Sequence, residues 1–466
     1  MATDVAILGG GAAGLSAARE TRRLGGRAVI VSNGPLGGDC TFTGCVPSKT
    51  VIEASLAGLS FDDAFGRARH VVERIASTES ADRLRAEGVE VIEGEGRLVV
   101  DGGRGAIEVG ERTVTARGVV VATGSRPLVP PIPGLAEVDH LTTDDLWQLT
   151  ERPASLAVIG GGAIGCELSQ ALARLGVAVT LIELAPRLLS NEEPEASRLA
   201  AEALRLAGVD VRTGAAVTSV AAGPGSVAGP SGVVLQLDDG TTVAAERVLV
   251  AVGRSPNAGS AGLAEAGLEL DDRGYVSNDD DLSTGLAGVY VAGDAAGRLQ
   301  LTHAADHMGR VAVNNVLRAR GPFRRQRFRA DQIPWVTFTT PEIARIGVTE
   351  DQAAGGGGAL VAELPLDEHD RALTADAVDG FIKIIAVPRP GLGMTGGGRI
   401  IGATIVAERA GEMLAEVALA VRLGAFTGRL AQTVHAYPTW SYGVAKTVGQ
   451  FFTEVEGRTA RPARRS

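Results

Sequence analysis

The sequence predicts an α/β protein with more than one domain. Its 466 residues are too many for a single hydrophobic core. A hydrophobic content of 45% with 21% charged residues is typical of a packed globular chain and not of a disordered one. The α/β class follows from a third observation, because an apolar strand-like run, a glycine turn and an alanine-rich helical segment follow one another twice.

The two copies of this pattern read VAILGGGAAG at residues 5–14 and AVIGGGAIG at residues 157–165. Each runs from a buried-strand pattern into Gly-x-Gly-x-x-Gly. In this motif the first glycine makes a tight turn, the second lets the backbone approach a pyrophosphate, and the third lets the helix pack closely. The glycines are Gly9, Gly11 and Gly14 in the first copy and Gly160, Gly162 and Gly165 in the second. The repeat therefore predicts two dinucleotide-binding units.

The residue that should meet the adenosine ribose differs between the copies. It is Ser32 after the first copy and Glu183 after the second. A carboxylate there accepts hydrogen bonds from the 2′-OH of NAD and repels the 2′-phosphate of NADP. We therefore expect NADH at the second unit. NADPH stays possible because Arg187 lies close enough in sequence to reach a phosphate. Ser32 offers only a hydroxyl, so its ribose contact is expected to be weaker.

Charge and hydropathy exclude several classes of partner. A net charge of −10 and a pI near 5.3 argue against a nucleic-acid surface, because phosphate binding needs clustered positive charge. No apolar run is long enough to span a bilayer. The start MATDVAILGG leads into a strand with neither the basic region nor the cleavage site of a signal peptide. We therefore expect a soluble cytoplasmic protein without nucleic-acid or membrane partners.

Cys40 and Cys45 are separated by four residues in GGDCTFTGCVPSK, in a chain with one other cysteine, Cys166. They could be metal ligands, a structural disulfide or a redox pair. Structural zinc needs four ligands, and no pair of His or Cys elsewhere completes a set, so we expect no metal site. A purely structural disulfide is unexpected in a reducing cytosol. Cys166 is expected to be a small core residue.

Further motifs follow in a fixed order: ATGSRP at residues 122–127, AVGRSPN at 251–257, VYVAGDAAG at 289–297 and VTFTTPEIARIGVTE at 336–350. Together with the two glycine motifs and the cysteine segment, they resemble the two-cysteine flavoprotein disulfide reductases. That family includes dihydrolipoamide dehydrogenase, glutathione reductase and mercuric reductase. The likeness covers nearly the whole chain, and it is strongest to the branch of mercuric reductase and dihydrolipoamide dehydrogenase.

The resemblance implies two Rossmann-like dinucleotide-binding domains, one for FAD and one for NAD(P), and an α+β C-terminal dimerisation domain. We place the FAD domain at residues 1–150 and 272–325 and the NAD(P) domain at 151–271. The dimerisation domain is expected at 330–455, and residues 456–466 are expected to form a disordered tail. A homodimer is implied, in which the last helix of one chain completes the active site of the other.

The resemblance also assigns roles to single residues. It implies that Cys40 and Cys45 form a redox disulfide, with Cys45 exchanging electrons with the flavin and Cys40 attacking the substrate. Lys49 corresponds to the lysine near flavin N5, and Glu167 to the glutamate that pairs with it. Asp294 resembles the aspartate that holds the ribityl chain of FAD. The same motifs place four further residues among those that bind the cofactors: Gly38, Thr123, Gly124 and Gly253.

The family pattern breaks at VHAYPTWSYG, residues 434–443. It aligns with the His-x-His-Pro-Thr-x-x-Glu signature, and His435 matches the first histidine. The second histidine, which is the acid and base for the thiols, is Tyr437 here, and the glutamate that orients it is Tyr442. A tyrosine with a pKa near 10 cannot shuttle protons at pH 7 as a histidine can.

Three functions remain open for this sequence. In the first, electrons pass from NAD(P)H through FAD and the two cysteines to a small-molecule or small-protein thiol or disulfide, with Tyr437 as hydrogen-bond donor and His435 or water as base. The second is a quinone reductase or diaphorase with direct transfer from the flavin. The third is reduction of a soft metal ion, although the C-terminal cysteine pair of mercuric reductases is missing.

Overall fold

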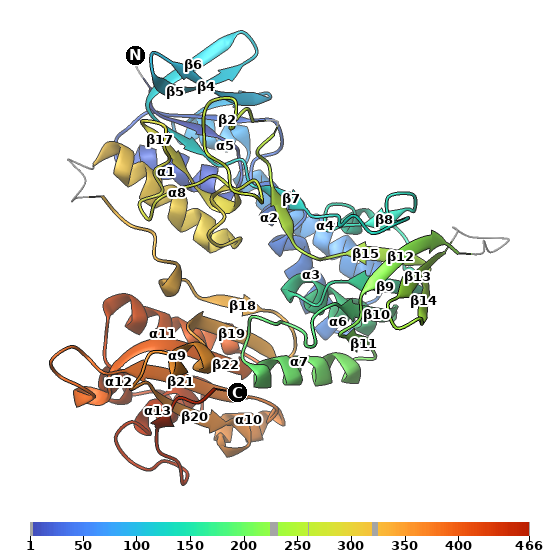
Figure 1. The fold of residues 1–466 in the computed structure, drawn as a ribbon, viewed down its shortest axis with the longest axis vertical. Coiled ribbons are helices and arrows are strands. Elements are labelled where there is room, and N and C mark those ends of the chain that lie inside the picture. The colour runs from blue at the N-terminus through green and yellow to red at the C-terminus, as the bar shows by residue number, and fades with distance from the viewer. Residues whose placement is uncertain (1–2, 224–231, 260, 319–324, 466) are drawn as a thin grey trace. The chain divides into compact units, whose positions relative to one another are not determined.

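The computed structural model describes residues 3–223, 232–259, 261–318 and 325–465. They form two compact units, each drawn from separate stretches of the chain (Figure 1). Unit 1 is drawn from residues 1–130, 141–152 and 252–329, and unit 2 from residues 131–140, 153–251 and 330–466. The chain therefore leaves each unit and later returns to it.

Unit 1 is built on a sheet whose central strands are parallel. Both β1 and β2 are apolar on both faces, because a parallel sheet is covered by helices on each side. The parallel strands run in the order β3-β2-β1-β6-β17 and comprise β1 (Thr3–Leu8), β2 (Ala28–Ser32), β3 (Glu90–Glu93), β6 (Arg112–Val121) and β17 (Val289–Val291). Antiparallel strands β5 (Arg104–Val109) and β4 (Gly96–Asp101) extend β6, and β7 (Ser125–Pro127) pairs with β16 (Arg254–Pro256).

The helices of unit 1 position the cysteine segment. Helix α1 (Ala12–Arg23) follows the first glycine turn and packs against α8 (Thr302–Leu317). Close approach of these two helices requires Gly309, since a Cβ there would lie 2.4 Å from the carbonyl oxygen of Ala13. The short helix α2 (Gly38–Phe42) leads into α3 (Cys45–Leu56), which packs against α4 (Phe61–Thr78), and α5 (Ala81–Ala86) follows.

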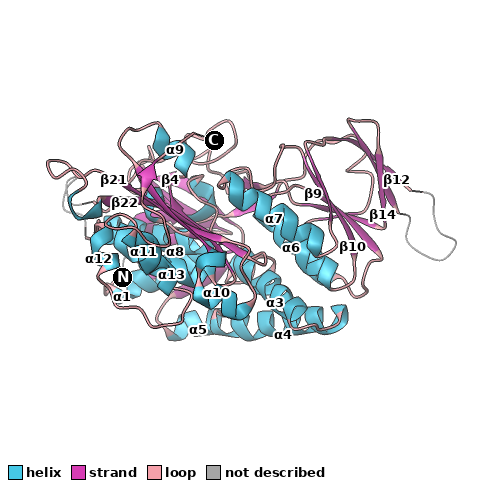
Figure 2. Cartoon of the chain, turned by 90° about the horizontal axis from the view of Figure 1, so that it is seen from below, coloured by secondary structure: helices cyan, strands magenta, loops and turns pink. Residues whose placement is uncertain are grey.

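Unit 2 begins with a second sheet, in the order β11-β10-β9-β15-β8, whose strands β11, β10, β9 and β15 are parallel. Figure 2 shows α6 and α7 beside β9 and β10. The elements are β8 (His140–Leu141), β9 (Ser155–Ile159), α6 (Ala163–Arg174), β10 (Ala178–Glu183), α7 (Pro194–Leu206), β11 (Asp210–Thr213) and β15 (Arg247–Val250). Strands β12 (Val217–Ala222), β13 (Val233–Leu237) and β14 (Thr242–Ala245) form a separate antiparallel sheet. The strand, glycine turn and helix of unit 1 thus recur here.

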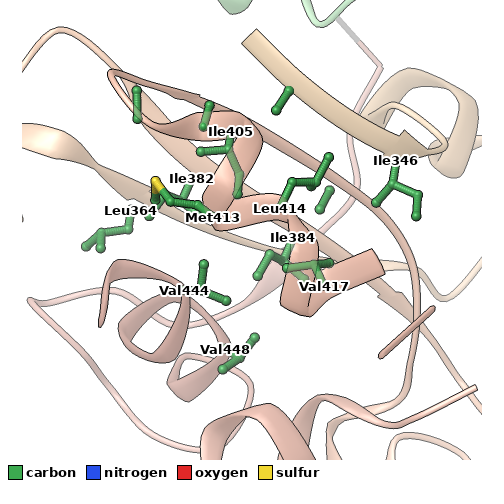
Figure 3. Packing of buried hydrophobic residues seen from close by; sticks show 14 of the residues in the cluster. Ile346, Leu364, Ile382, Ile384, Ile405, Met413, Leu414, Val417, Val444 and Val448 are labelled. Carbon is green, nitrogen blue, oxygen red and sulfur yellow. The ribbon is translucent and has the colours of Figure 1, made fainter. Parts of the chain in front are cut away.

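The rest of unit 2 is an antiparallel sheet covered by helices. Its order is β18-β19-β22-β21-β20-β23. The strands are β18 (Trp335–Thr337), β19 (Glu342–Gly347), β20 (Leu360–Pro365), β21 (Phe381–Val387), β22 (Arg399–Ala407) and β23 (Arg461–Pro462). The helices are α9 (Glu350–Ala354), α10 (Asp370–Ala375), α11 (Ala410–Leu423), α12 (Thr427–Ala431) and α13 (Tyr442–Gly449). Their buried aliphatic side chains form one core, to which β21 gives Ile382 and Ile384, and α11 gives Met413 and Val417 (Figure 3).

The C-terminal segment departs from the sequence-based expectation of a disordered tail. Strand β23 pairs antiparallel with β20, with Arg461 opposite Val361 and Pro462 opposite Leu360. The guanidinium of Arg461 binds the carboxylate of Glu350. Arg461 of the predicted tail therefore has an acidic partner on α9.

The architecture confirms the predicted α/β class with two similar dinucleotide-type sheets. Among the described residues, no helix is long and apolar enough to cross a membrane. Over those same residues, His, Cys, Asp and Glu side chains form no group of three or more that could hold a metal ion.

Candidate active site

The first glycine turn connects β1 to α1, and a side chain at its first or third glycine would clash with the backbone. Gly9 has a φ of +114°, and a Cβ there would lie 2.1 Å from the carbonyl oxygen of Ala122. A Cβ on Gly14 would lie 2.0 Å from the carbonyl oxygen of Gly9, so the helix packs directly on the turn. A Cβ on Gly11 would meet no protein atom within 4 Å. The turn therefore leaves open space at the start of α1, where a phosphate would bind.

Four further residues of unit 1 are predicted to bind a cofactor: Gly38, Thr123, Gly124 and Gly253. Gly38 approaches Gly11 so closely that a Cβ would lie 2.9 Å from the Gly11 Cα. Gly124 and Gly253 both have positive φ, and a Cβ on either would meet no protein atom within 4 Å. The buried hydroxyl of Thr123 has no hydrogen-bond partner within the protein. These features fit a bound dinucleotide, since a ligand could pack against the open glycines and hydrogen-bond to the hydroxyl.

Ser32 has a hydrogen-bond partner within its own loop, and its expected ribose contact stays a prediction. It lies at the end of β2, as predicted, but it is buried and its Oγ donates to the carbonyl oxygen of Gly34 at 2.9 Å. A Cβ on Gly10 would lie 2.6 Å from this Oγ. The serine hydroxyl therefore supports the turn that follows its own strand.

Asp294 lies just after β17 and belongs to a polar chain within unit 1. Its Oδ2 accepts from Ser125 Oγ at 2.5 Å and lies 3.6 Å from Nε of Arg254. Arg254 also donates to Ser125 Oγ at 2.6 Å and binds Asp39, the neighbour of Cys40. Sequence reasoning missed Arg254, although it stands inside the AVGRSPN motif. This arginine connects the predicted flavin-binding aspartate to the cysteine segment.

The two cysteines lie on adjacent helices, Cys40 within α2 and Cys45 as the first residue of α3. Both carry thiols in this structure; Cys40 is half-buried and Cys45 is exposed. A hydrogen bond to Cys45 and burial together raise the pKa of the Cys40 thiol. The sequence-based expectation for Cys166 is met, since its side chain is completely buried. The paired thiols are therefore Cys40 and Cys45.

Thr302 brings a hydroxyl to the thiols. Its Oγ1 lies 3.3 Å from the Sγ of Cys45, and its hydrogen bond to Cys40 favours the thiolate of that cysteine. Thr302 is also the first residue of α8, where unpaired backbone N–H groups and the helix dipole favour negative charge. Sequence reasoning missed this residue, because only the fold brings the start of α8 to the cysteines.

Three contacts hold the segment that carries the cysteines. Nε1 of Trp147 donates to the carbonyl oxygen of Thr43 at 2.8 Å. Thr41 Oγ1 donates to Glu79 at 2.7 Å, and the Asp39 carboxylate binds Arg254. Such contacts matter because thiol exchange requires the attacking and leaving sulfurs to stay aligned.

Lys49 and Glu167 lie in different compact units, and their pairing stays a prediction. Lys49 is half-buried on α3, one helical turn after Cys45. Glu167 is buried on α6, and its Oε1 accepts from the backbone N–H of Phe338 at 2.8 Å.

The second glycine turn repeats the geometry of the first. Gly160 has a φ of +111°, and a Cβ on Gly165 would lie 1.9 Å from the carbonyl oxygen of Gly160. A Cβ on Gly162, at the start of α6, would meet no protein atom within 4 Å. This turn therefore offers the same kind of phosphate site, on unit 2.

Glu183 ends β10 next to this turn. Its carboxylate accepts from the N–H of Gly161 at 2.5 Å and from the N–H of Ala185 at 2.7 Å. The side chain is half-buried, so it retains an exposed surface. Each carboxylate oxygen has two acceptor positions, which leaves capacity for a ribose hydroxyl.

The C-terminal loop holds the residues that replace the expected histidine and glutamate. Tyr437 is exposed, and its hydroxyl donates to Asp370 at 2.9 Å. This hydrogen bond raises the pKa of Tyr437, so the phenol stays protonated at neutral pH. The Tyr442 ring stands edge-on to Tyr437, with the ring centroids 5.5 Å apart.

His435 has a carboxylate partner that sequence reasoning missed. Its Nε2 lies 2.7 Å from Oε2 of Glu416 on α11, and its Nδ1 lies 2.9 Å from the carbonyl oxygen of Thr433. Glu416 comes from a helix before the signature, so no spacing rule identifies it. Both ring nitrogens face acceptor oxygens, and proton transfer to a substrate would require one of these contacts to open.

Comparison with known proteins finds matches over nearly the whole chain. Residues 3–309 match the family described as pyridine nucleotide-disulphide oxidoreductase, and residues 333–447 match its dimerisation domain. A mercuric reductase from Bacillus cereus is 32% identical over 97% of this chain and 72% of its own length. A dihydrolipoyl dehydrogenase from Thermus scotoductus is 32% identical over 95% of either chain.

A solved structure shares the fold. It is the Cu(II) complex of the HOCl-induced flavoprotein disulfide reductase RclA from Escherichia coli. The match has a TM-score of 0.84 and 25% sequence identity, and it covers 96% of this chain and 99% of that chain.

Proposed function

The chain belongs to the pyridine nucleotide-disulphide oxidoreductase family, whose members are NAD(P)H-dependent flavoprotein enzymes that use FAD, and from this premise we propose that it reduces a thiol- or disulfide-type acceptor with electrons from NADH. Membership confirms the predicted family resemblance and enzyme class. The dimerisation-domain match supports the expected homodimer, in which the loop at residues 432–442 of one chain would approach the cysteines of the other.

The observation that carries this proposal is the pair of thiols beside the start of α8. Cys45 Sγ lies 3.3 Å from the hydroxyl of Thr302, the first residue of that helix. A hydroxyl donor and a helix N-terminus both stabilise a thiolate relative to the thiol. When bound, FAD supplies a two-electron carrier between the nicotinamide and the cysteine pair.

The cysteines then transfer two electrons by thiol exchange. The Cys40 thiolate attacks one sulfur of the acceptor disulfide, which breaks that bond, forms a mixed disulfide and releases the first thiolate. The Cys45 thiolate next attacks Cys40 Sγ and releases the second thiolate. The products are two thiols, once each thiolate takes a proton, and a Cys40–Cys45 disulfide.

Proton handling differs from that of relatives with the complete signature. Tyr437 stays protonated because of its hydrogen bond to Asp370, and its single O–H could serve a leaving thiolate once that contact opens. His435, with Glu416 as its partner, is the proposed base. General acid–base help is worth roughly 10² to 10⁴ in rate, so turnover of ordinary disulfides is expected to be slow.

The preference for NADH is supported by the surroundings of Arg187. Its guanidinium donates to the carbonyl oxygens of Ser190 and Glu192, at 2.6 Å and 2.9 Å, and to Ser197 Oγ at 2.6 Å. An arginine engaged in this way is poorly available for a 2′-phosphate. Glu183 keeps a carboxylate where that phosphate would lie.

Reduction of a soft metal ion is the second candidate. One relative is a mercuric reductase, and the structural neighbour RclA was solved with Cu(II). Cys45 is exposed and Tyr437 is a neutral donor, and both properties suit a metal ion carried by thiols. Direct transfer to a quinone remains the outcome expected if the cysteines lie outside the electron path.

An anaerobic titration tests the proposed route. Purified holoprotein is titrated with NADH and with NADPH, while the flavin spectrum is recorded and electrons are counted. We expect a long-wavelength thiolate-to-flavin band that disappears in Cys45→Ser and persists in the control Cys166→Ser. Immediate bleaching of the flavin without this band would contradict the route through the cysteines.

Acceptor assays separate the candidate functions. Cys45→Ser is expected to lose at least about 10³-fold in disulfide reduction and to retain quinone reduction. Equal losses on both acceptors would argue against a separate flavin route. Hg(II) turnover that exceeds disulfide turnover in the wild type would favour the second candidate.

A change at Tyr437 tests the proton assignment. Tyr437→His should raise disulfide turnover, since it restores a side chain that titrates near pH 7, and Tyr437→Phe should lower it. Steady-state rates between pH 6 and pH 9 measure both effects. Identical rates for the three proteins would remove Tyr437 from the reaction.

A further inference from the structure

The loop that follows Glu183 is anchored at its far end by buried charges. This loop, residues 184–193, ends in Glu192 and Glu193, which are 7% and 1% exposed. Both carboxylates contact basic side chains of the antiparallel sheet in the same unit. Buried charges are rare unless they are paired, so each of these carboxylates depends on its basic partner.

Arg345 on β19 makes the more extensive contact. Its Nε donates to Glu192 Oε2 at 2.7 Å, and its Nη2 donates to the carbonyl oxygen of Asn191 at 2.9 Å. The guanidinium lies over the ring of Trp335, 4.2 Å from its centroid, and Trp335 Nε1 donates to the other oxygen of Glu192 at 2.8 Å. Arg345 is 5% exposed. The sheet thus holds both the side chain of Glu192 and the backbone before it.

Lys383 on β21 makes a second, weaker contact. Its Nζ lies 3.6 Å from Glu193 and is shared with Glu195, Glu350 and Glu363. Glu193 also accepts from the backbone N–H of Glu350 at 2.8 Å. This lysine holds several carboxylates together and is not specific for the loop.

The near end of the loop connects these anchors to the predicted ribose-binding carboxylate. Arg187 donates to the carbonyl oxygen of Glu192 at 2.9 Å, so the loop is closed on itself. The N–H of Leu189 donates to the carbonyl oxygen of Gly161 at 2.9 Å, and the N–H of Gly161 donates to Glu183 at 2.5 Å. Continuous hydrogen bonds therefore run from Arg345 to the glycine turn and to Glu183.

We propose that Arg345 is a positioning residue for dinucleotide selection: by holding Glu192 and Asn191 it fixes the loop that orients Glu183 toward the ribose. The proposal rests on the proposed NADH-dependent function and adds a residue from outside the dinucleotide-binding motif. Arg345 does not itself contact the nucleotide in this scheme. Its loss should weaken the discrimination between NADH and NADPH and leave the flavin and cysteine site unchanged.

The experiment measures binding of NADH and NADPH to the holoprotein by anaerobic stopped-flow titration, together with FAD content and melting temperature. Arg345→Met should raise the Kd for NADH by roughly 3- to 30-fold and change the Kd for NADPH much less, with wild-type FAD content. Arg345→Lys should have an intermediate effect, because a lysine keeps the charge and loses the forked contact. Arg458→Met removes the ion pair with Glu368 elsewhere in the same unit, and it should leave the ratio of the two Kd values unchanged.

Glu192→Gln is the isosteric variant for the case in which Arg345→Met does not fold. Like Arg345→Met, it should reduce the preference for NADH over NADPH. Wild-type Kd ratios in Arg345→Lys and Glu192→Gln, with only a lower melting temperature, would overturn the positioning role and leave the proposed function intact. A wild-type protein that binds NADPH as tightly as NADH would overturn the NADH preference, and the positioning role with it.

Discussion

The two glycine turns place the same constraints on their backbones, but the strands that follow them end in different residues. In both, the first glycine has a φ above +110° and the third packs against the carbonyl of the first. In unit 1 the next strand ends in Ser32, whose hydroxyl is used by its own turn. In unit 2 it ends in Glu183, whose carboxylate is held by two backbone N–H groups and keeps a partly exposed surface. The turn thus provides a general phosphate site, and the strand end decides how the ribose is recognised.

The largest effect should come from the third glycine of either turn. Gly14→Ala and Gly165→Ala place a Cβ about 2 Å from a backbone oxygen, and such overpacking costs roughly 3 kcal/mol or more. Gly14→Ala should yield protein without FAD, whereas Gly165→Ala should keep FAD and bind NADH at least about 100-fold more weakly. FAD content and NADH titration measure these losses. Loss of FAD in both variants would break the assignment of one cofactor to each turn.

Removing the charge at Glu183 should give the next largest effect. Glu183→Gln loses charge-assisted hydrogen bonds worth roughly 1.5–3 kcal/mol, so the Kd for NADH should rise about 10- to 100-fold. The Kd for NADPH should change little or fall, because the repulsion of a 2′-phosphate is removed. A matched Glu202→Gln change on the exposed surface of α7 should alter neither constant.

The second glycine of each turn offers a gentler test of the same comparison. Gly11 and Gly162 have φ values of −78° and −74°, and an added Cβ would meet no protein atom. Gly11→Ala and Gly162→Ala should therefore leave the melting temperature within about 2 °C of the wild type once FAD is removed. Each variant should weaken the binding of the cofactor at its own turn by about tenfold, since the methyl group would occupy the approach to the pyrophosphate. Unchanged affinity would place the phosphates elsewhere.

The smallest effect is expected at Ser32. Ser32→Ala removes a hydrogen bond to Gly34, worth about 1 kcal/mol, and no direct cofactor contact is expected. FAD content should stay within about twofold of the wild type, and a small drop in melting temperature should be the only change. A strong loss of FAD would show that the hydroxyl turns to the ribose when the cofactor binds.

The outline of the fold was predictable because its signals are local. The strand, glycine turn and helix occupy neighbouring residues, so their repeat at Gly9 and Gly160 predicted two similar sheets. The paired thiols were likewise visible in one short segment. The disordered tail was a wrong expectation, because the pairing of β23 with β20 and of Arg461 with Glu350 joins residues that are far apart in the sequence.

The parts of the site that sequence reasoning missed are joined only by the fold. Thr302 lies 257 residues after Cys45, and Arg254 lies 215 residues after Asp39. Glu416 reaches His435 from α11, at a spacing that no motif records. The ribose contact expected of Ser32 stays a prediction, and a local hydrogen bond from Ser32 to Gly34 competes with it.

The discontinuity of unit 1 has a consequence for biosynthesis. Helix α1 is made within the first 23 residues, and α8, which packs on it through Gly309, is made only after residue 301. Strand β17 likewise joins β6 late. While the ribosome makes the intervening residues, the apolar faces of α1 and β6 lack their final cover, and contacts this distant in sequence form slowly. The nascent chain should therefore depend on chaperones, and FAD should be captured late, after α8 has left the ribosome.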